Sequence, residues 1–533
     1  MATDRLLRVV LLLVGALFLS MVSRADPDLW GHVRYGQDVL AEGRLPATAT
    51  YTFTAPDHPW INHENIAEIV FAGAMNLVGP PGLGVVRGLL ALAVMGLFLS
   101  AAHRRGAGLA ATALTVVLVG WNLGSWWTAR PQLFTNAGFA AMIFLLDRGG
   151  WWLALIPPLF AVWANAHGGF VAGLLMLGLY LGCRGLEALV RDGRAAWPRV
   201  VGLAGLGLLA ALATLVTPYG IDYAVWLFQD LAPPRPEISE WARLGPHHQQ
   251  FVPFVLLVAV TAVAFAARGR PRDVTQLVCL VVAAIQAFAH LRHIPFFAIL
   301  AAFWLPPRLE PLLARLAARR AAAAAPAPAP RPARLLRPAL VAAAVLLAAT
   351  MGAQLSRLRV DRAQYPVDAF AFMAEHGITG RAVVYFDWSQ YAIAAFAPRL
   401  TVAFDGRFRT CYPQDVADAH FDLILGDRPG RRWRSPESSP FDPTRALEMG
   451  APELVLLNRH VPHGPDVMRN APGWVLLYQD ELAELWGRRE RWDDPTSPDY
   501  LPPERRAISD RPQTGFVRFP ALPHGAEGRV GPL

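Results

Sequence analysis

Residues 6–32 have the sequence LLRVVLLLVGALFLSMVSRADPDLWGH, in which a long apolar run ends in a cluster of polar side chains. The apolar part, Leu6–Val22, is long enough to cross a bilayer. Ser23–Ala25 could form a signal-peptide cleavage site, but the length of the run and the apolar runs that follow favour an uncleaved transmembrane helix. A bare anchor needs only a polar end, so the carboxylates, tryptophan and histidine of Asp26–His32 indicate a membrane-embedded active site.

The composition is that of a membrane protein. Of the 533 residues, 54% are hydrophobic and only 17% are charged, and apolar runs of spanning length recur to about residue 355. The predicted fold class is therefore a polytopic α-helical membrane protein. The formal net charge of +8 comes largely from arginines in short connections, which is typical of cytoplasmic loops and requires no nucleic-acid partner. Cys183 and Cys279 fall in or beside apolar runs, which argues against a disulfide framework.

The basic clusters predict an orientation with about eleven transmembrane helices. Placing these clusters in the cytoplasm leaves most histidines and the unusual polar groups on the opposite side. The run at 65–79 is then an interfacial or re-entrant helix. The spans are expected near residues 5–23, 83–102, 107–125, 132–146, 150–165, 168–185, 199–217, 251–267, 274–290, 294–307 and 336–354.

A small α/β domain is expected after the last span, at 356–492, and by parity it lies in the periplasm of a bacterium. Ala321–Pro338 is rich in alanine, proline and arginine, so a cytoplasmic linker at 311–335 is expected to be extended and mobile. Residues 493–533 are expected to be extended or disordered. The expected domains are a transmembrane core at 1–310 with a first outer loop at 24–64, the linker, the last span at 336–355, the α/β domain and this tail. Within the domain, the pattern predicts a helix at 365–376 and strands at 381–386, 400–404, 453–457 and 474–478.

Asp26 and Asp28 are the first candidates for chemistry. Two carboxylates separated by one proline can coordinate a divalent cation, or one can act as a general base. They could instead only mark the helix end, and Trp30 could be an interfacial anchor. A second polar and aromatic cluster in the same loop, at 51–54 and 60–64, favours a functional loop over a mere connector.

Several cationic groups belong to the same outer side. Arg130 opposes the positive-inside bias, so it is expected to have an anionic partner, either a phosphate or one of Asp26, Asp28 and Glu64. His167 lies in a Gly-containing polar island between apolar runs, where it either faces a cavity or is a satisfied turn residue. Similar polar residues lie elsewhere on this side: His290, Arg292, His293, and Tyr219 in the sequence TPYG.

Soluble-enzyme motifs are absent from the sequence. It contains no P-loop, HExxH, paired CxxC or nucleophile elbow. In the tail, Asp405–Arg407 is most simply a strand end and turn, with contact to a substrate as the lesser alternative.

The chain resembles the GT-C superfamily of integral membrane glycosyltransferases, whose first outer loop carries acidic residues where Asp26 and Asp28 lie. A group of bacterial GT-C-like membrane proteins is similar in more particular stretches. These are DPDLWGHVRYGQ, HPWINHEN, TARPQLF, WANAHGGF, TPYG and RHIPFF, and less specifically YPVDAFAFM and FDGR. The resemblance is best over residues 1 to about 310.

This resemblance implies a transferase that uses a polyprenyl-phosphate-linked sugar as donor and a glycan, lipid or protein as acceptor, in the bacterial cytoplasmic (inner) membrane. Asp26 and Asp28 would act as base or hold a divalent cation, Mg or Mn. The substrate-binding residues would be His32, His63, Glu64, Arg130, His167, Tyr219, Arg292 and His293. Two alternatives are a transporter or flippase for a lipid-linked or anionic solute, and a non-catalytic envelope assembly protein. The one-sided polar groups and the lack of a visible repeat argue against a transporter.

Overall fold

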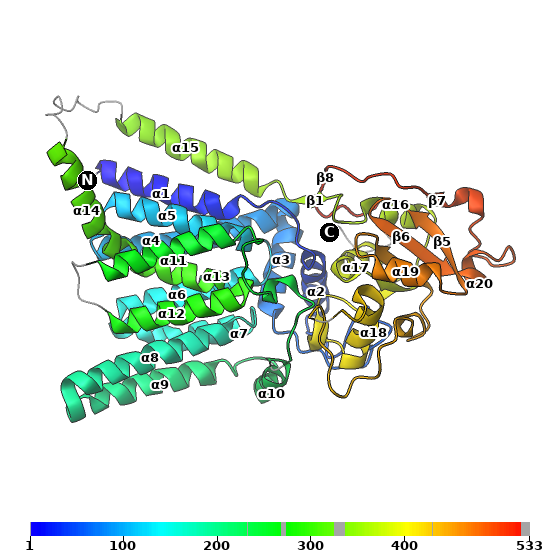
Figure 1. Ribbon diagram of the computed structural model, residues 1–533, viewed down its shortest axis with the longest axis horizontal. Coiled ribbons are helices and arrows are strands. Elements are labelled where there is room, and N and C mark those ends of the chain that lie inside the picture. Colours follow the sequence, from blue (N-terminus) through cyan, green and yellow to red (C-terminus); the bar gives the residue numbers. More distant parts are fainter. Residues whose placement is uncertain (1, 232, 268–272, 324–335, 429, 524–533) are drawn as a thin grey trace. The chain divides into compact units, whose positions relative to one another are not determined.

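The computed structural model describes residues 2–231, 233–267, 273–323, 336–428 and 430–523 (Figure 1). Contacts divide the chain into two units. The first, here called the helical unit, comprises Met1–Ser23, Gly84–Ile221 and Ser239–Ser356. The second, called the mixed unit, comprises Arg24–Leu83, Asp222–Ile238 and Arg357–Leu533.

Apolar helices build the helical unit. They are α1 (Ala2–Ser20), α4 (Pro80–Arg104), α5 (Leu109–Leu123), α6 (Gln132–Arg148), α7 (Ile156–Ala164), α8 (Phe170–Asp192), α9 (Trp197–Ala213), α11 (Phe251–Ala266), α12 (Val274–Ala289), α13 (Ile294–Trp304), α14 (Pro306–Ala323) and α15 (Leu336–Leu355). In Figure 1, α8 and α9 lie side by side as a hairpin, and α1 lies beside α15. The first residues of α4 belong to the mixed unit by their contacts.

Among the described residues, four stretches are long and apolar enough to cross a membrane, which makes the chain a multi-pass membrane protein. They are Pro80–Arg104, Leu109–Trp126, Phe170–Ala213 and Leu336–Leu355. The pair Leu291–Trp304 and Pro306–Arg320, bent by 60°, would make a fifth. Several other apolar helices are shorter, so the count of about eleven spans stays a prediction.

Small residues let these helices approach closely. The ring of Trp163 in α7 packs against Gly138 of α6 and Gly173 of α8, where a Cβ atom would come within 2.8 and 2.4 Å of the ring. Gly15 of α1 similarly faces Met95 and Val116. Such small-residue contacts are how membrane helices associate without a hydrophobic driving force between them.

The first outer loop is largely helical. It contains α2 (Leu29–Glu42), which was not predicted, and α3 (Asn65–Val78), which coincides with the run expected to be an interfacial or re-entrant helix. The two helices cross at Gly36, where a Cβ atom would lie 2.1 Å from the backbone oxygen of Glu68. Glycine therefore permits the backbones to touch at this crossing.

The tail forms a six-stranded sheet with strand order β3-β2-β4-β6-β5-β7. The strands are β2 (Arg381–Val384), β3 (Thr401–Val402), β4 (Leu454–Asn458), β5 (Trp474–Gln479), β6 (Ala483–Arg488) and β7 (Ala507–Ile508). Strand β2 is parallel to β3 and β4, whereas β6 is antiparallel to both β4 and β5. The four predicted strands are confirmed within a few residues, as is the helix at 365–376, and β6 is added.

Helices pack around this sheet (Figure 1). They are α16 (Val367–Glu375), α17 (Ser389–Phe396), α18 (Gln414–Leu425), α19 (His463–Arg469) and α20 (Arg489–Trp492). Helix α10 (Gly220–Leu231) lies mostly in the mixed unit.

The expected linker and final tail differ in part from the structure. Helix α14 continues to Ala323, so the first part of the expected linker is helical, and residues 324–335 lie outside the described part. Residues 493–523 are mostly irregular but contain two short paired strands: β7 adds to the sheet, and β8 (Phe516–Arg518) pairs antiparallel with β1 (Arg359–Asp361). Residues 524–533 lie outside the described residues.

The first outer loop and the tail share one core. Tyr35 and Trp60 of the loop are buried together with Phe404, Phe408 and Phe421 of the tail. We expected this loop to belong with the transmembrane core, whereas its contacts group it with the α/β domain. The acidic pair at the start of the loop is therefore positioned by tail residues.

Candidate functional site

The tail holds the backbone that precedes the acidic pair. The amide of Ala25 donates to the carbonyl of Arg359 at 2.7 Å, and the hydroxyl of Tyr365 donates to the carbonyl of Ala25 at 3.2 Å. Asp26 is 9% exposed, and its Oδ1 accepts the amide of Asp28 at 3.1 Å. Asp28 is the N-cap residue of α2 and is half-buried, so it is the more accessible carboxylate.

Trp30 is a core residue and not an interfacial anchor. Its ring stacks on Tyr391 at 4.5 Å and contacts Tyr365 at 4.9 Å. Its indole N–H donates to the carbonyl of Pro520 at 2.8 Å, and 1% of the residue is exposed. Trp30 thus joins the start of α2 to α17, to the segment before α16 and to Pro520.

Two tail residues, Gly406 and Gln390, lie close to the start of α2. A Cβ atom on Gly406 would be 2.2 Å from Asp28 Oδ1 and 2.7 Å from Gln390 Nε2. A Cβ atom on Gly31, in α2, would be 2.1 Å from Gln390 Oε1. Gly406 therefore lies against Asp28, and Gln390 lies against both Gly406 and Gly31. Gln390 was not among the predicted site residues, and nothing in its local sequence pattern marks it.

The residues beside Gly406 are structural. Arg407 forms a fully buried ion pair with Asp405 at 2.7 Å and donates to the carbonyl of Thr50 at 2.6 Å. Its guanidinium also lies over the rings of Tyr35, at 4.6 Å, and Trp60, at 4.8 Å. Burial alone would raise the pKa of Asp405, but Arg407 outweighs this effect and holds that pKa below its usual value. This turn fastens the loop to the tail and so places Gly406.

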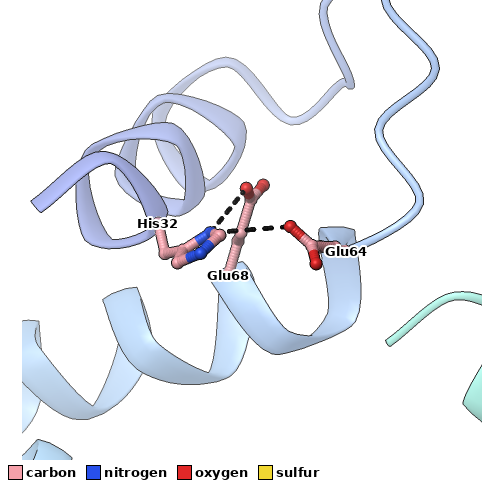
Figure 2. A group of neighbouring side chains, drawn as sticks. All are labelled: His32, Glu64 and Glu68. Carbon is pink, nitrogen blue, oxygen red and sulfur yellow. Dashed lines mark hydrogen bonds and ion pairs between the residues drawn. The ribbon is translucent and has the colours of Figure 1, made fainter. Parts of the chain in front are cut away.

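A histidine and two glutamates meet where α2 crosses α3 (Figure 2). His32 Nδ1 is 3.3 Å from Glu68 Oε1 and 3.9 Å from Glu64 Oε2. Asn62 donates to the other oxygen of Glu68 at 2.6 Å. Burial opposes a charge on His32, but the hydrogen bond with Glu68 and the charges of Glu64, Glu68 and Asp28 raise its pKa to about 9.

Glu68 was missed by the sequence analysis, although a signal for it exists. It lies four residues after Glu64, and residues at that spacing share one face of a helix. It is 2% exposed in an otherwise apolar helix, where a buried carboxylate needs partners. A metal ion needs several His, Cys, Asp or Glu side chains close together. Among the described residues, one group of three such side chains could hold an ion, namely His32, Glu64 and Glu68. The expected metal ligands Asp26 and Asp28 are not part of it.

His63 extends this cluster toward α10. Its Nε2 atom is 3.9 Å from Glu64 Oε1, and its ring lies 6.2 Å from Tyr223 and 5.4 Å from Trp226. Burial and the charge of Glu64 raise the pKa of Tyr223 well above its usual value, so this hydroxyl stays protonated. The mixed unit thus collects five predicted site residues: Asp26, Asp28, His32, His63 and Glu64.

In the helical unit, one short turn contacts both predicted phosphate-binding arginines. This turn is η4 (Ser239–Trp241). Arg130 pairs with Glu240 at 2.7 Å, a carboxylate that we had not considered as its partner. Arg292 lies over the ring of Trp241 at 4.5 Å. Residues far apart in the sequence are therefore brought together by two consecutive residues of the outer loop.

The remaining predicted residues lie in the same unit. His293 is in η5 (Leu291–His293), and its ring is 6.1 Å from that of Trp241. His167 Nδ1 accepts the amide of Gly169 at 3.0 Å and lies 2.7 Å from the hydroxyl of Thr135. That hydroxyl also accepts the indole N–H of Trp163 at 2.9 Å, so Thr135 links His167 to Trp163.

Tyr219 belongs to a tight turn. Thr217 Oγ1 accepts the backbone amides of Tyr219 at 3.3 Å and of Gly220 at 3.1 Å. Gly220 has a φ of 53°, which favours glycine. The TPYG sequence is thus explained by the turn that starts α10.

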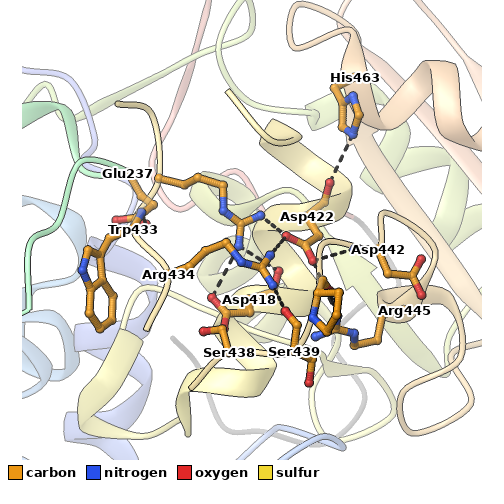
Figure 3. Close-up of polar contacts among 12 residues, drawn as sticks. Glu237, Asp418, Asp422, Trp433, Arg434, Ser438, Ser439, Asp442, Arg445 and His463 are labelled. Carbon is orange, nitrogen blue, oxygen red and sulfur yellow. Dashed lines mark hydrogen bonds and ion pairs between the residues drawn. The ribbon is translucent and has the colours of Figure 1, made fainter. Parts of the chain in front are cut away.

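A further polar cluster ties α18 to the segment that follows it (Figure 3). Asp422 is fully buried and pairs with Arg432 and Arg434, and its Oδ2 accepts the amide of Asp442 at 3.1 Å. Asp418 is 3.4 Å from Arg432. Because guanidinium groups and amides match these carboxylates, we interpret the cluster as structural.

Comparison with known proteins identifies the architecture. No family model and no curated protein sequence matches the chain. Among solved structures, it is similar to the archaeal oligosaccharyltransferase AglB from Archaeoglobus fulgidus, in complex with an inhibitory peptide and a dolichol-phosphate. The TM-score is 0.52 at 11% identity, over 85% of this chain and 69% of AglB.

It is also similar to ArnT from Cupriavidus metallidurans. The TM-score to ArnT bound to undecaprenyl phosphate is 0.52 at 13% identity, over 94% of this chain and all of ArnT. For the apo state it is 0.50 at 15% identity, over 91% and 98%. The chain has the fold of the GT-C membrane glycosyltransferases. The resemblance to the GT-C superfamily that the sequence indicated is therefore confirmed for the fold.

Proposed function

We propose that this GT-C-fold protein transfers a sugar from a polyprenyl-phosphate-linked donor to an acceptor at the outer face of the bacterial cytoplasmic membrane. The observation that carries this proposal is the fold shared with two proteins solved with a dolichol-phosphate and with undecaprenyl phosphate, over 85% and 94% of this chain. The fold alone does not define a reaction, so the proposal also depends on the residues described above.

Arg130 and Arg292 are the groups proposed to bind the donor phosphate. Guanidinium groups bind phosphate oxygens through paired, charge-assisted hydrogen bonds. Both arginines contact η4, through Glu240 and Trp241, which would keep them in place before the donor binds. As the sugar leaves, these cations would stabilise the charge that develops on the phosphate.

Asp28 is proposed as the general base. The acceptor hydroxyl would attack the anomeric carbon of the sugar, the bond from that carbon to the phosphate oxygen would break, and polyprenyl phosphate would leave. The hydroxyl proton would pass to the Asp28 carboxylate. Asp28 is favoured over Asp26 because it is more exposed, and because one oxygen of Asp26 already accepts the Asp28 amide.

Substitution of Asp28 tests this assignment. Asp28→Asn removes the base but keeps the size of the side chain, so transfer should fall by roughly 100- to 10,000-fold. Variants would be expressed in a deletion strain, with the cell-envelope glycan and the lipid-linked donor measured together. The control is Glu42→Gln, which changes an exposed residue of the same helix. It should restore the glycan and return the lipid-linked donor to its wild-type level.

The same strain separates the alternatives. Loss of a transferase leaves one sugar missing and its lipid-linked donor accumulating at the outer face. Loss of a flippase would leave the donor facing the cytoplasm, and loss of an assembly protein would be rescued by the tail alone. If Asp28→Asn, inserted and folded, restored the glycan fully, the catalytic assignment would be wrong.

A further inference from the structure

We propose that His32, Glu64 and Glu68 form a three-ligand site for a divalent cation of the Zn²⁺ or Mn²⁺ class. The site would fasten α2 to α3 one helical turn after Asp28. Its role beside the base rests on the proposed function, whereas the binding of the ion does not and can be measured without a substrate.

The spacing of the three side chains suits a single ion. Their ligand atoms all lie within 4.8 Å of one another. Two ligands about 2.1 Å from a tetrahedral ion are about 3.4 Å apart, and a wider angle of about 135° separates them by about 3.9 Å. The observed separations from His32 Nδ1 are 3.3 Å to Glu68 and 3.9 Å to Glu64.

The contacts of His32 with the two glutamates are long for charge-assisted hydrogen bonds. Such bonds between a cationic N–H and a carboxylate are usually about 2.7–2.9 Å long. Both separations in this cluster exceed that range. In Figure 2 the imidazole and both carboxylates converge on one point between the helices.

The ligand types limit the choice of ion. One imidazole nitrogen with carboxylate oxygens is a common ligand set for Zn²⁺ and is also suitable for Mn²⁺, whereas Mg²⁺ prefers oxygen ligands and water. Two carboxylates and a neutral imidazole balance the charge of a divalent ion. Three protein ligands leave at least one position for water or another oxygen ligand.

Neighbouring residues hold the ligands in place. Asn62 donates to Glu68 Oε2 at 2.6 Å, which leaves Oε1 directed at His32 and is the kind of outer contact that orients metal ligands. The amide of Glu64 donates to Asn62 Oδ1 at 3.1 Å. Gly36, one turn after His32, lets the α2 backbone touch that of α3 at Glu68 itself.

The position links the ion to Asp28. The amide of His32 donates to the carbonyl of Asp28 at 3.0 Å in the first turn of α2. An ion held by His32 would therefore fix this turn against α3, and with it the direction of the Asp28 carboxylate. His32, Glu64 and Glu68 are positioning residues in this account.

Metal content of the purified full-length protein tests the proposal. The protein would be stripped with EDTA, supplied with Zn²⁺ or Mn²⁺ and dialysed. It should then retain one equivalent of one of these ions, measured by elemental mass spectrometry. Glu68→Gln should weaken binding by at least about tenfold, since even outer-shell changes cost that much. Glu42→Gln removes an exposed carboxylate from the same helix and should leave binding unchanged.

A second measurement guards against misfolding. Glutamine at 68 can still accept from Asn62, so the variant should fold, and its apparent melting temperature should no longer rise when the ion is added. The wild type should show that rise. The proposal would be overturned if the wild-type protein retained no equivalent of either ion. It would also be overturned if Glu68→Gln bound the ion as well as the wild type. Metal binding without transfer activity would instead count against the proposed function alone.

Discussion

Gly406 is a single tail residue that restricts the position of the Asp28 side chain. Its conformation does not require glycine, since it is not among the glycines with positive φ. The requirement comes from its neighbours, because any Cβ atom would meet Asp28 Oδ1 at 2.2 Å. Asp28 is a short side chain on the first turn of a helix, so it would have to rotate away.

Gly406→Ala should therefore reduce transfer with little effect on folding. A displacement of the base by about 1 Å costs on the order of 100-fold in rate. Donor accumulation in the deletion strain would report the loss. The matched control is Gly73→Ala on α3, where a Cβ atom would meet nothing within 4 Å. Full activity of a stable Gly406→Ala variant would show that the tail does not position Asp28.

Among single residues, the sequence predicted the charged groups at the ends of apolar runs. It missed residues whose role depends on contacts with distant segments. Asp26 and Arg130 stand out because charged groups are rare at the ends of apolar runs. Glu68 is hidden inside an apolar helix, and Gln390 becomes relevant only through its approach to Gly31 and Gly406. Such contacts between distant segments leave no mark in the local pattern.

Among the elements, strands were easier to predict than the helix that carries the site. Strands β4 and β5 are continuous apolar runs, LVLLN and WVLLYQ, bounded by polar residues. Helix α2 has the mixed sequence LWGHVRYGQDVLAE, with two glycines inside it. Glycine lowers helix propensity, so only the packing of α2 against α3 and α17 reveals why these glycines are present.

Helix α18 carries a histidine that should make stability depend on pH. His420 is 1% exposed among the rings of Phe386, Phe404 and Phe421. Neither ring nitrogen has a hydrogen-bond partner in the part of the chain that the structure describes. Burial lowers its pKa to about 3, although the nearby charge of Asp405 acts in the opposite direction.

Below the unfolded pKa of about 6.5, the unfolded chain takes up a proton at this position and the folded protein does not. The contribution of His420 to stability is therefore intact above that pH and falls by about 1.4 kcal/mol per pH unit as pH decreases toward 3. His420→Leu should remove this dependence.

Melting curves of the detergent-purified protein at pH 7 and pH 5 provide the measurement. The wild type should lose about 2 kcal/mol more than the variant between these values, because other titrating groups are common to both. Parallel losses in the two proteins would mean that His420 is protonated in the folded state or is accessible to water.

At the scale of the whole molecule, the sequence predicted the membrane class, the GT-C fold and a sheet-containing tail. It did not predict that the first outer loop and the tail share a core, because Arg407, Tyr35 and Trp60 meet only after folding. The number of spans also stays a prediction, since several apolar helices are shorter than a bilayer requires.

Binding of the donor phosphate can be tested separately from the role of the base. Asp28 and the His32 cluster belong to the mixed unit, whereas Arg130 and Arg292 belong to the helical unit. The central claim is that this chain binds a polyprenyl phosphate through these arginines. Binding of undecaprenyl phosphate to the purified full-length protein, measured by native mass spectrometry, tests that claim most directly.

Arg130→Gln is the informative variant, and Arg243→Gln, which changes an exposed arginine shortly after η4, is its control. Removing one charged hydrogen-bonding partner costs about 1.5–3 kcal/mol, so the affinity of Arg130→Gln should fall by about ten- to a hundredfold. The account predicts binding by the wild type and by Arg243→Gln, and much weaker binding by Arg130→Gln. No binding by the wild type, or equal binding by all three proteins, would contradict it.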